Sequence, residues 1–173
     1  MSPDTGVYPE IIMTSHQTLI VDNFLNSEEI NYLQQCPKAW GTQTSDNSNP
    51  KCLQFLISYP EVNDFYNHLF EKIKKEIGSY SCVRFYFNGQ SYGMDGSFHS
   101  DKCDKTVLIY VSPYDREWGG FTQIGEEIIA PVTGRMIIFD GMTPHKAFPF
   151  SRQTCPMRIT LAFKLDENRN RKI

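Results

Sequence analysis

The chain has 173 residues, of which 40% are hydrophobic and 21% are charged, as is typical of one globular domain with its own core. Its formal net charge of −3 gives no basis for general binding to nucleic acid or to an anionic membrane. The opening MSPDTGVYPE lacks the basic and apolar regions of a signal peptide, and no apolar run reaches the ~18 residues of a membrane span. Five cysteines are scattered without a CxxC pair, so we expect free thiols and a cytoplasmic location.

A short strand and a helix are predicted after an irregular arm over residues 1–16. The stretch 17–22 (QTLIVD) is apolar and β-branched, which favours a strand. Ser27 is a suitable N-cap and two glutamates follow it, so a helix is expected from Ser27 to about Gln35. Pro37 ends this helix, and the polar stretch 39–51 predicts a surface loop.

A second strand, over 52–59, is followed by a longer predicted helix. Pro60 is expected to open this helix, which would run to about Ile77 and end at Gly78. Apolar side chains recur through it at helical spacing: Val62, Phe65, Leu69 and Ile73.

From residue 80 onward the pattern changes to short strands separated by turns. The expected strands are 81–88, the segment around His99, 105–112, 121–124, 127–131, 135–139 and 158–165. Turns are predicted at Gly89–Gln90 and Asp140–Gly141. Two helices and about eight strands predict a single α+β domain over 1–173, with a jelly-roll core and the helices packed on one sheet.

The segment His99-Ser100-Asp101 is the strongest candidate for a metal site. On a strand, side chains two residues apart point to the same side, so this imidazole and carboxylate can face one ion. With His145 they would complete the two-histidine, one-carboxylate set that binds Fe(II) and leaves positions for a co-substrate and O2. An HxD pattern is common, and a hydrogen-bonded surface pair is the alternative.

Arg158 and Thr160 open the last predicted strand and share one of its faces. A guanidinium offers a planar fork for a carboxylate, and a hydroxyl beside it would add a further contact. The pair is therefore a candidate anchor for a dicarboxylate, the alternatives being a surface charge and an ordinary strand threonine. Arg152, in the loop before this strand, is a weaker candidate for the same role.

These residues occur in an order that resembles a known enzyme superfamily. The segments that carry the resemblance are Tyr86-Phe87-Asn88-Gly89, His99-Ser100-Asp101, Tyr110, Trp118-Gly119-Gly120-Phe121-Thr122, Gly134 to Asp140, His145 and Arg158-Ile159-Thr160. The stretch 84–163 resembles the Fe(II)/2-oxoglutarate-dependent dioxygenases, in particular their prolyl 4-hydroxylase-like branch. The segment 20–25, before a Ser-Glu-Glu helix, is similar to the same branch.

The resemblance implies a double-stranded β-helix core over about 80–165 and a complete co-substrate site. It implies His99, Asp101 and His145 as catalytic iron ligands. It also implies that Arg158 pairs with the far carboxylate of 2-oxoglutarate. The accompanying pocket residues would be Thr160, Tyr86 and Tyr110.

The implied reaction is hydroxylation of a substrate C–H by O2, coupled to decarboxylation of 2-oxoglutarate to succinate and CO2, with ascorbate in support. The expected substrate is a prolyl residue of a peptide or protein. Hydroxylation of a free amino acid or another small molecule is a second reading. A non-catalytic, cupin-like metal-binding module is a third, although such a module has no need of a carboxylate anchor.

Overall fold

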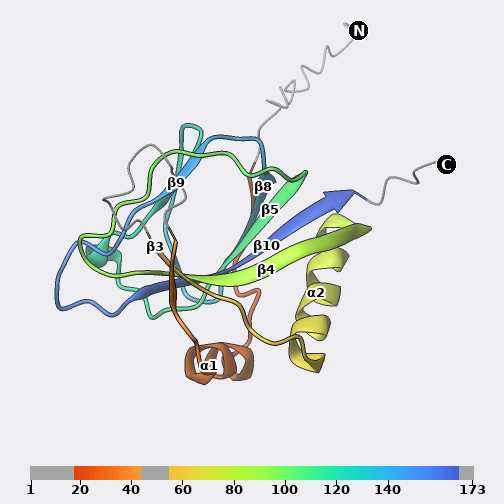
Figure 1. Ribbon diagram of the computed structural model, residues 1–173, viewed down its shortest axis with the longest axis horizontal. Helices are drawn as coiled ribbons and strands as arrows, with labels where there is room; N and C mark the ends of the chain where they lie inside the picture. Colours follow the sequence, from red (N-terminus) through yellow and green to blue (C-terminus); the bar gives the residue numbers. More distant parts are fainter. Residues whose placement is uncertain (1–17, 44–54, 168–173) are drawn as a thin grey trace, which may run out of the picture.

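The computed structural model of the protein describes residues 18–43 and 55–167 (Figure 1). The expected arm over 1–16 lies outside these residues, as do most of the loop expected over 39–51 and the start of the strand expected over 52–59. No helix in the described ranges is both long and apolar enough to cross a membrane.

The first helix, α1 (Ser27–Gln35), begins at the expected position but is capped by the preceding residue. The side chain of Asn26 accepts a hydrogen bond from the Glu29 amide at 2.9 Å, and the Glu29 carboxylate accepts one from the Asn26 amide at 2.8 Å. This reciprocal pair is a capping box. The prediction that Ser27 caps the helix was wrong, because Asn26 already satisfies the exposed amide.

The second helix, α2 (Asp64–Ile77), begins later than Pro60. The side chain of Asn63 accepts hydrogen bonds from the amides of Phe65 and Tyr66, at 3.0 and 3.3 Å, and fixes the start of the helix there. An ion pair of 2.7 Å between Lys72 and Glu29 joins α2 to α1.

In the part of the chain that the structure describes, ten strands form two antiparallel sheets. They are β1 (Leu19–Val21), β2 (Gly41–Gln43), β3 (Phe55–Ser58), β4 (Tyr80–Gln90), β5 (Lys105–Tyr110), β6 (Thr122–Ile124), β7 (Glu127–Ile129), β8 (Met136–Asp140), β9 (His145–Ala147) and β10 (Arg158–Glu167). The large sheet has the order β1-β8-β5-β10-β4-β3-β2, and the small sheet has the order β7-β6-β9. A single 3-10 turn, η1 (Arg116–Trp118), precedes β6.

The alternation of side chains along β10 separates two layers of core. Leu161, Phe163 and Leu165 pack with both helices on one face of the large sheet. Ala162 lies on the opposite face, in a cluster that includes residues of the small sheet. Figure 1 shows both helices on the outer side of the large sheet, away from β9. The predicted architecture, a jelly-roll core with N-terminal helices on one sheet, is therefore confirmed.

Three details of the predicted strands were wrong. Gly89 and Gln90 do not form a turn but continue β4, and Gly89 is required because a Cβ there would lie 2.6 Å from the sulfur of Met157. Residues 41–43 are not loop but β2, which pairs with β3. The strand expected around His99 is reduced to one isolated bridge in an otherwise irregular segment.

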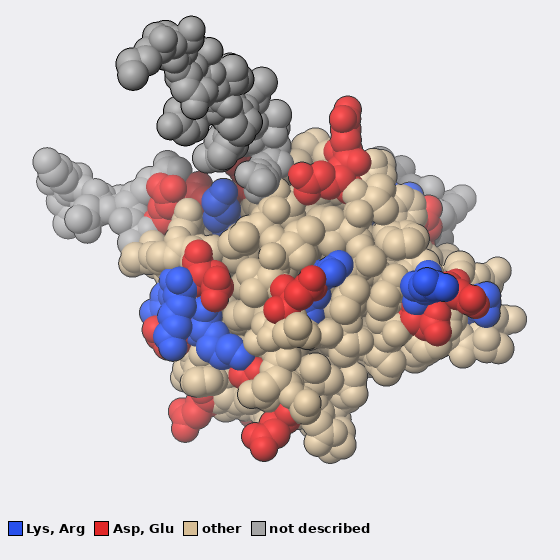
Figure 2. All heavy atoms as spheres, turned by 180° about the vertical axis from the view of Figure 1, so that it is seen from behind, with Lys and Arg blue, Asp and Glu red and all other residues tan. Residues whose placement is uncertain are grey.

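Charged side chains on the face shown in Figure 2 lie in small groups of mixed sign, separated by wide uncharged areas. This face therefore carries no broad basic surface, in keeping with the overall charge of −3.

Candidate metal and co-substrate site

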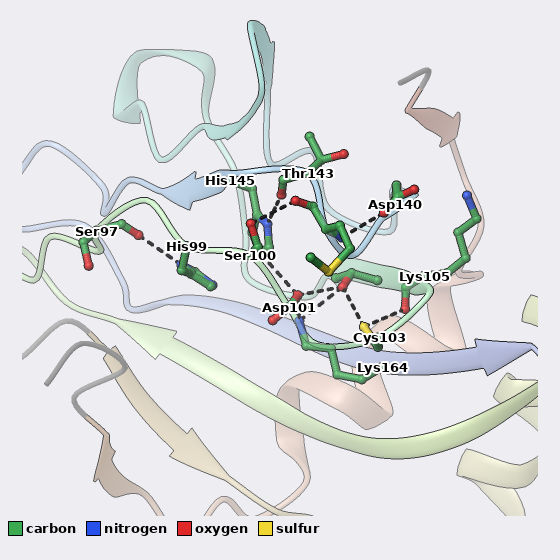
Figure 3. Close-up of polar contacts among 12 residues, drawn as sticks. Ser97, His99, Ser100, Asp101, Cys103, Lys105, Asp140, Thr143, His145 and Lys164 are labelled. Carbon is green, nitrogen blue, oxygen red and sulfur yellow. Dashed lines mark hydrogen bonds and ion pairs between the residues drawn. The ribbon is translucent and has the colours of Figure 1, made fainter. Parts of the chain in front are cut away.

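Three potential metal ligands from distant parts of the chain converge. His99 and Asp101 lie in the segment between β4 and β5, and His145 is the first residue of β9. One ligand atom from each lies within 4.8 Å of the others. Figure 3 shows these side chains around a common space, with Asp101 between His145 and the end of Lys164. Such a set could hold a divalent transition metal with coordination positions left open.

Backbone and side-chain hydrogen bonds orient both imidazoles. The His99 amide donates to the His145 carbonyl at 3.0 Å, and the His145 amide donates to the His99 carbonyl at 2.9 Å. The Nδ1 of His99 lies 3.0 Å from the Ser97 carbonyl, and that of His145 lies 2.9 Å from the Thr143 carbonyl. A carbonyl can only accept, so each Nδ1 carries the proton and each Nε2 is free to bind a metal. Burial lowers the pKa of His99 below its ordinary value, which favours the neutral, metal-binding form.

The carboxylate of Asp101 is held by donors on one of its oxygens. The hydroxyl of Thr106 donates to Oδ2 at 2.6 Å, and the ammonium of Lys164 donates to the same atom. Burial alone would raise the pKa of Asp101, but the adjoining His145 and the Lys164 ammonium outweigh burial and hold this pKa well below its usual range. The carboxylate is therefore ionised, and its other oxygen carries no hydrogen bond from these residues.

The guanidinium of Arg158 is buried next to the three potential ligands. Its Nε donates to the Gly120 carbonyl at 2.7 Å, and its Nη2 donates to Thr122 Oγ1 at 2.8 Å. Only 2% of Arg158 is exposed, yet no carboxylate within the described ranges forms an ion pair with it. Burial lowers its pKa, although an arginine remains charged. A buried charge without a counterion is costly, so this side chain is well suited to bind an anion.

A cavity connects this guanidinium with the two histidines. Both imidazoles line it, together with the predicted residues Arg158, Thr160 and Tyr86. Tyr110, the remaining predicted pocket residue, is not part of the lining. Its hydroxyl instead donates to Thr122 Oγ1 at 2.7 Å, and its ring lies 5.5 Å from the Arg158 guanidinium carbon.

The competing candidate Arg152 is excluded from the cavity. Its side chain is 56% exposed and lies 3.3 Å from the carboxylate of Glu117 at the surface. Of the two arginines, only Arg158 can therefore reach an anion bound beside the three potential ligands.

Four further polar residues of the site were not predicted. Thr122 accepts from both Tyr110 and Arg158, which leaves its own hydroxyl proton available for a ligand. Asn88 lines the cavity, and its buried Oδ1 has no hydrogen-bond partner in the described structure. Gln90 and Lys164 also line it. The strand pattern carried this signal. Asn88 and Gln90 share a face of β4 with Tyr86, and Lys164 shares a face of β10 with Arg158.

These observations fit a metal with an organic acid beside it. The three potential ligands are of the types that Fe(II) accepts. The guanidinium, which has no carboxylate partner in the described ranges, and the Thr122 hydroxyl are donors that a bound carboxylate would satisfy. The residues present are thus suited to both groups.

No family model and no curated protein sequence matches the chain. Solved structures do resemble it in fold. A collagen prolyl hydroxylase of Paramecium bursaria chlorella virus-1, in complex with 2-oxoglutarate, superposes with a TM-score of 0.60 at 17% identity, over 86% of this chain and 94% of that one. A prolyl-4-hydroxylase of Pseudomonas putida gives 0.60 at 14% identity, over 88% and 94%. HygX of Streptomyces hygroscopicus, with nickel and 2-oxoglutarate bound, gives 0.62 at 11% identity, over 87% and 83%. The chain therefore has the fold of these 2-oxoglutarate-Fe(II) oxygenases.

Proposed function

We propose that this protein is an Fe(II)- and 2-oxoglutarate-dependent dioxygenase that hydroxylates a substrate C–H. The observation that carries the proposal is the buried, unpaired guanidinium of Arg158, in a cavity that also reaches His99 and His145. A structural metal site needs no such charge, and this argues against a non-catalytic cupin-like module. The shared fold with oxygenases that bind 2-oxoglutarate gives independent support.

The metal would be held by His99, Asp101 and His145. The bound iron would supply the oxidising chemistry, in which O2 converts 2-oxoglutarate to succinate and CO2 while the substrate gains a hydroxyl group. The carbonyls of Ser97 and Thr143 accept from Nδ1 of each ring, so that Nε2 would be the metal-binding nitrogen.

The far carboxylate of 2-oxoglutarate would pair with the Arg158 guanidinium and accept the free proton of the Thr122 hydroxyl. Thr160, Tyr86 and Asn88 would border the molecule. Tyr110 would act indirectly, since its hydroxyl fixes the orientation of Thr122.

A prolyl residue of a peptide or protein is the first candidate substrate. Support comes from the fold shared with the viral and bacterial prolyl hydroxylases. A small-molecule substrate is the second candidate, and a structure of HygX with hygromycin B bound shares the fold as well. Ascorbate would keep the iron reduced in either case.

Separate measurements of metal binding, 2-oxoglutarate binding and turnover test the proposal. We expect Mn(II) and 2-oxoglutarate to bind in calorimetry, and Fe(II) with ascorbate to support succinate formation in the presence of proline-containing peptides or free amino acids. His99→Ala should lose the metal. Arg158→Met should keep the metal but lose 2-oxoglutarate affinity, whereas the matched surface variant Arg152→Met should keep both. If wild-type protein binds no 2-oxoglutarate and forms no succinate under any condition, the proposal is wrong.

A further inference from the structure

A second, larger cavity opens beside the same three potential ligands. It has a volume of about 430 Å³, and both His99 and Asp101 line it. Residues of β3 and β4 also line it. Arg158 and Thr160 line only the first cavity. The larger cavity therefore reaches the potential metal ligands from a different side and has the size of a small-molecule site.

The charges around this second cavity are mostly positive. Arg84 and Lys102 both lie in its lining, and neither forms an ion pair with a carboxylate in the described ranges. Among the described residues of the lining, the only carboxylate is that of Asp101, whose charge is already paired with Lys164. The cavity thus has a surplus of positive charge in a protein whose net charge is −3.

Aromatic and apolar side chains form the rest of the wall. The rings of Tyr59 and Tyr86 lie 5.7 Å apart, and the Arg84 guanidinium carbon lies 5.5 Å from the centre of the Tyr86 ring. This ring contact holds the guanidinium at the cavity wall without neutralising it. Tyr59 and Val83 are 62% and 57% exposed, so apolar surface is available beside the two cations.

We propose that this cavity binds the primary substrate through a carboxylate, which Arg84 and Lys102 hold, while an apolar part of the substrate packs on Tyr59 and Val83. The proposal rests on the proposed function, because the oxidised C–H must face the metal bound by His99 and Asp101. The carboxylate can belong to a free organic acid or to an acidic peptide. In either case the reaction remains the hydroxylation described above.

Matched acid and amide probes test this proposal on full-length protein loaded with Mn(II) and saturated with 2-oxoglutarate, so that no acid can enter the first cavity. The first pair is N-acetyl-L-proline and N-acetyl-L-prolinamide, and the second is hippuric acid and its amide. A third pair, acetyl-Pro-Asp-amide and acetyl-Pro-Asn-amide, places the carboxylate on a peptide side chain. Binding is measured by calorimetry, and proximity to Mn(II) by broadening of the probe proton resonances.

We expect at least one acid to bind about tenfold or more tightly than its amide, as one charge-assisted hydrogen bond allows. The pair with the largest ratio of acid affinity to amide affinity identifies the source of the carboxylate. The double variant Arg84→Gln/Lys102→Gln should bring this ratio close to one. Arg116→Gln, which removes an exposed arginine outside the cavity, should leave the ratio unchanged.

Equal binding of acid and amide in every pair, or no detectable binding of any acid, would overturn the proposal. An acid preference that survives in the double variant would overturn it as well. Absence of Mn(II) or 2-oxoglutarate binding before any probe is added would instead show that the proposed function is wrong. The two failures are therefore distinguishable.

Discussion

Replacing Lys164 by Met should destabilise the metal-free protein much more than the metal-loaded protein. The Lys164 and Asp101 side chains are 5% and 8% exposed, so the variant leaves a carboxylate buried without its main counterion. Removing one partner of a buried ion pair costs about 3–5 kcal/mol. We expect the lower end, about 3 kcal/mol, because the Thr106 hydroxyl still donates to Asp101.

A bound divalent ion should replace the lost positive charge. If the metal-loaded variant loses only about 1 kcal/mol, the thermodynamic cycle requires it to bind metal about 2 kcal/mol more tightly than wild type, which is roughly 30-fold. The free energy of unfolding is measured by urea titration in EDTA and again in saturating Mn(II), and Mn(II) affinity is measured directly.

Lys72→Met is the matched control for this experiment. It breaks the Lys72–Glu29 pair between the two helices, in which the side chains are 23% and 9% exposed. Its cost should be the same in EDTA and in Mn(II), because that pair lies away from the potential ligands. Equal costs for Lys164→Met in the two conditions would refute the assignment of Asp101 as a metal ligand whose charge Lys164 balances.

Three further outcomes are expected. Arg158→Met should weaken 2-oxoglutarate binding by at least about 30-fold in calorimetry, since truncation of one partner of a buried charge pair costs about 2 kcal/mol or more; unchanged affinity would refute the anchor role. Gly120→Ala should lower the free energy of unfolding by about 1–3 kcal/mol more than Gly119→Ala in urea titration, because both glycines have φ above +70° but only at position 120 would a Cβ lie 2.5 Å from the Phe150 ring. Equal costs for the two glycine substitutions would show that the positive φ, and not the contact with Phe150, determines the loss of stability. Ile73→Ala should cost about 2–5 kcal/mol in the same assay, whereas Ile128→Ala, at a position that is 56% exposed, should cost much less; a small loss at position 73 would contradict its place in the core.

Local patterns in the chain determine much of the fold and the types of side chain at the site. Period-two alternation in the last strand separates Arg158 and Thr160 from Leu161 and Phe163, so the polar face of β10 is predictable without a structure. Helix positions are also predictable from local signals: α1 begins at the expected residue, whereas the Asn63 cap moved the start of α2 beyond Pro60. The spacing of His99 and Asp101 pointed to a metal site, but the strand on which that argument relied is reduced to one isolated bridge, so their shared orientation comes from the tertiary structure.

Only the tertiary structure decided which distant groups meet. His99 precedes the strands β6 and β7 in the sequence, and His145 follows them. No local pattern encodes the backbone bridge that joins these two residues. The neighbours of the Arg158 guanidinium come from β4 and β6, through Gln90 and Thr122, and only their placement shows that it has no carboxylate partner in the described ranges. The role of Lys164 likewise depended on the approach of Asp101. Sequence determined which side chains share a face, because periodicity acts over a few residues; the partners across each cavity were set by long-range packing.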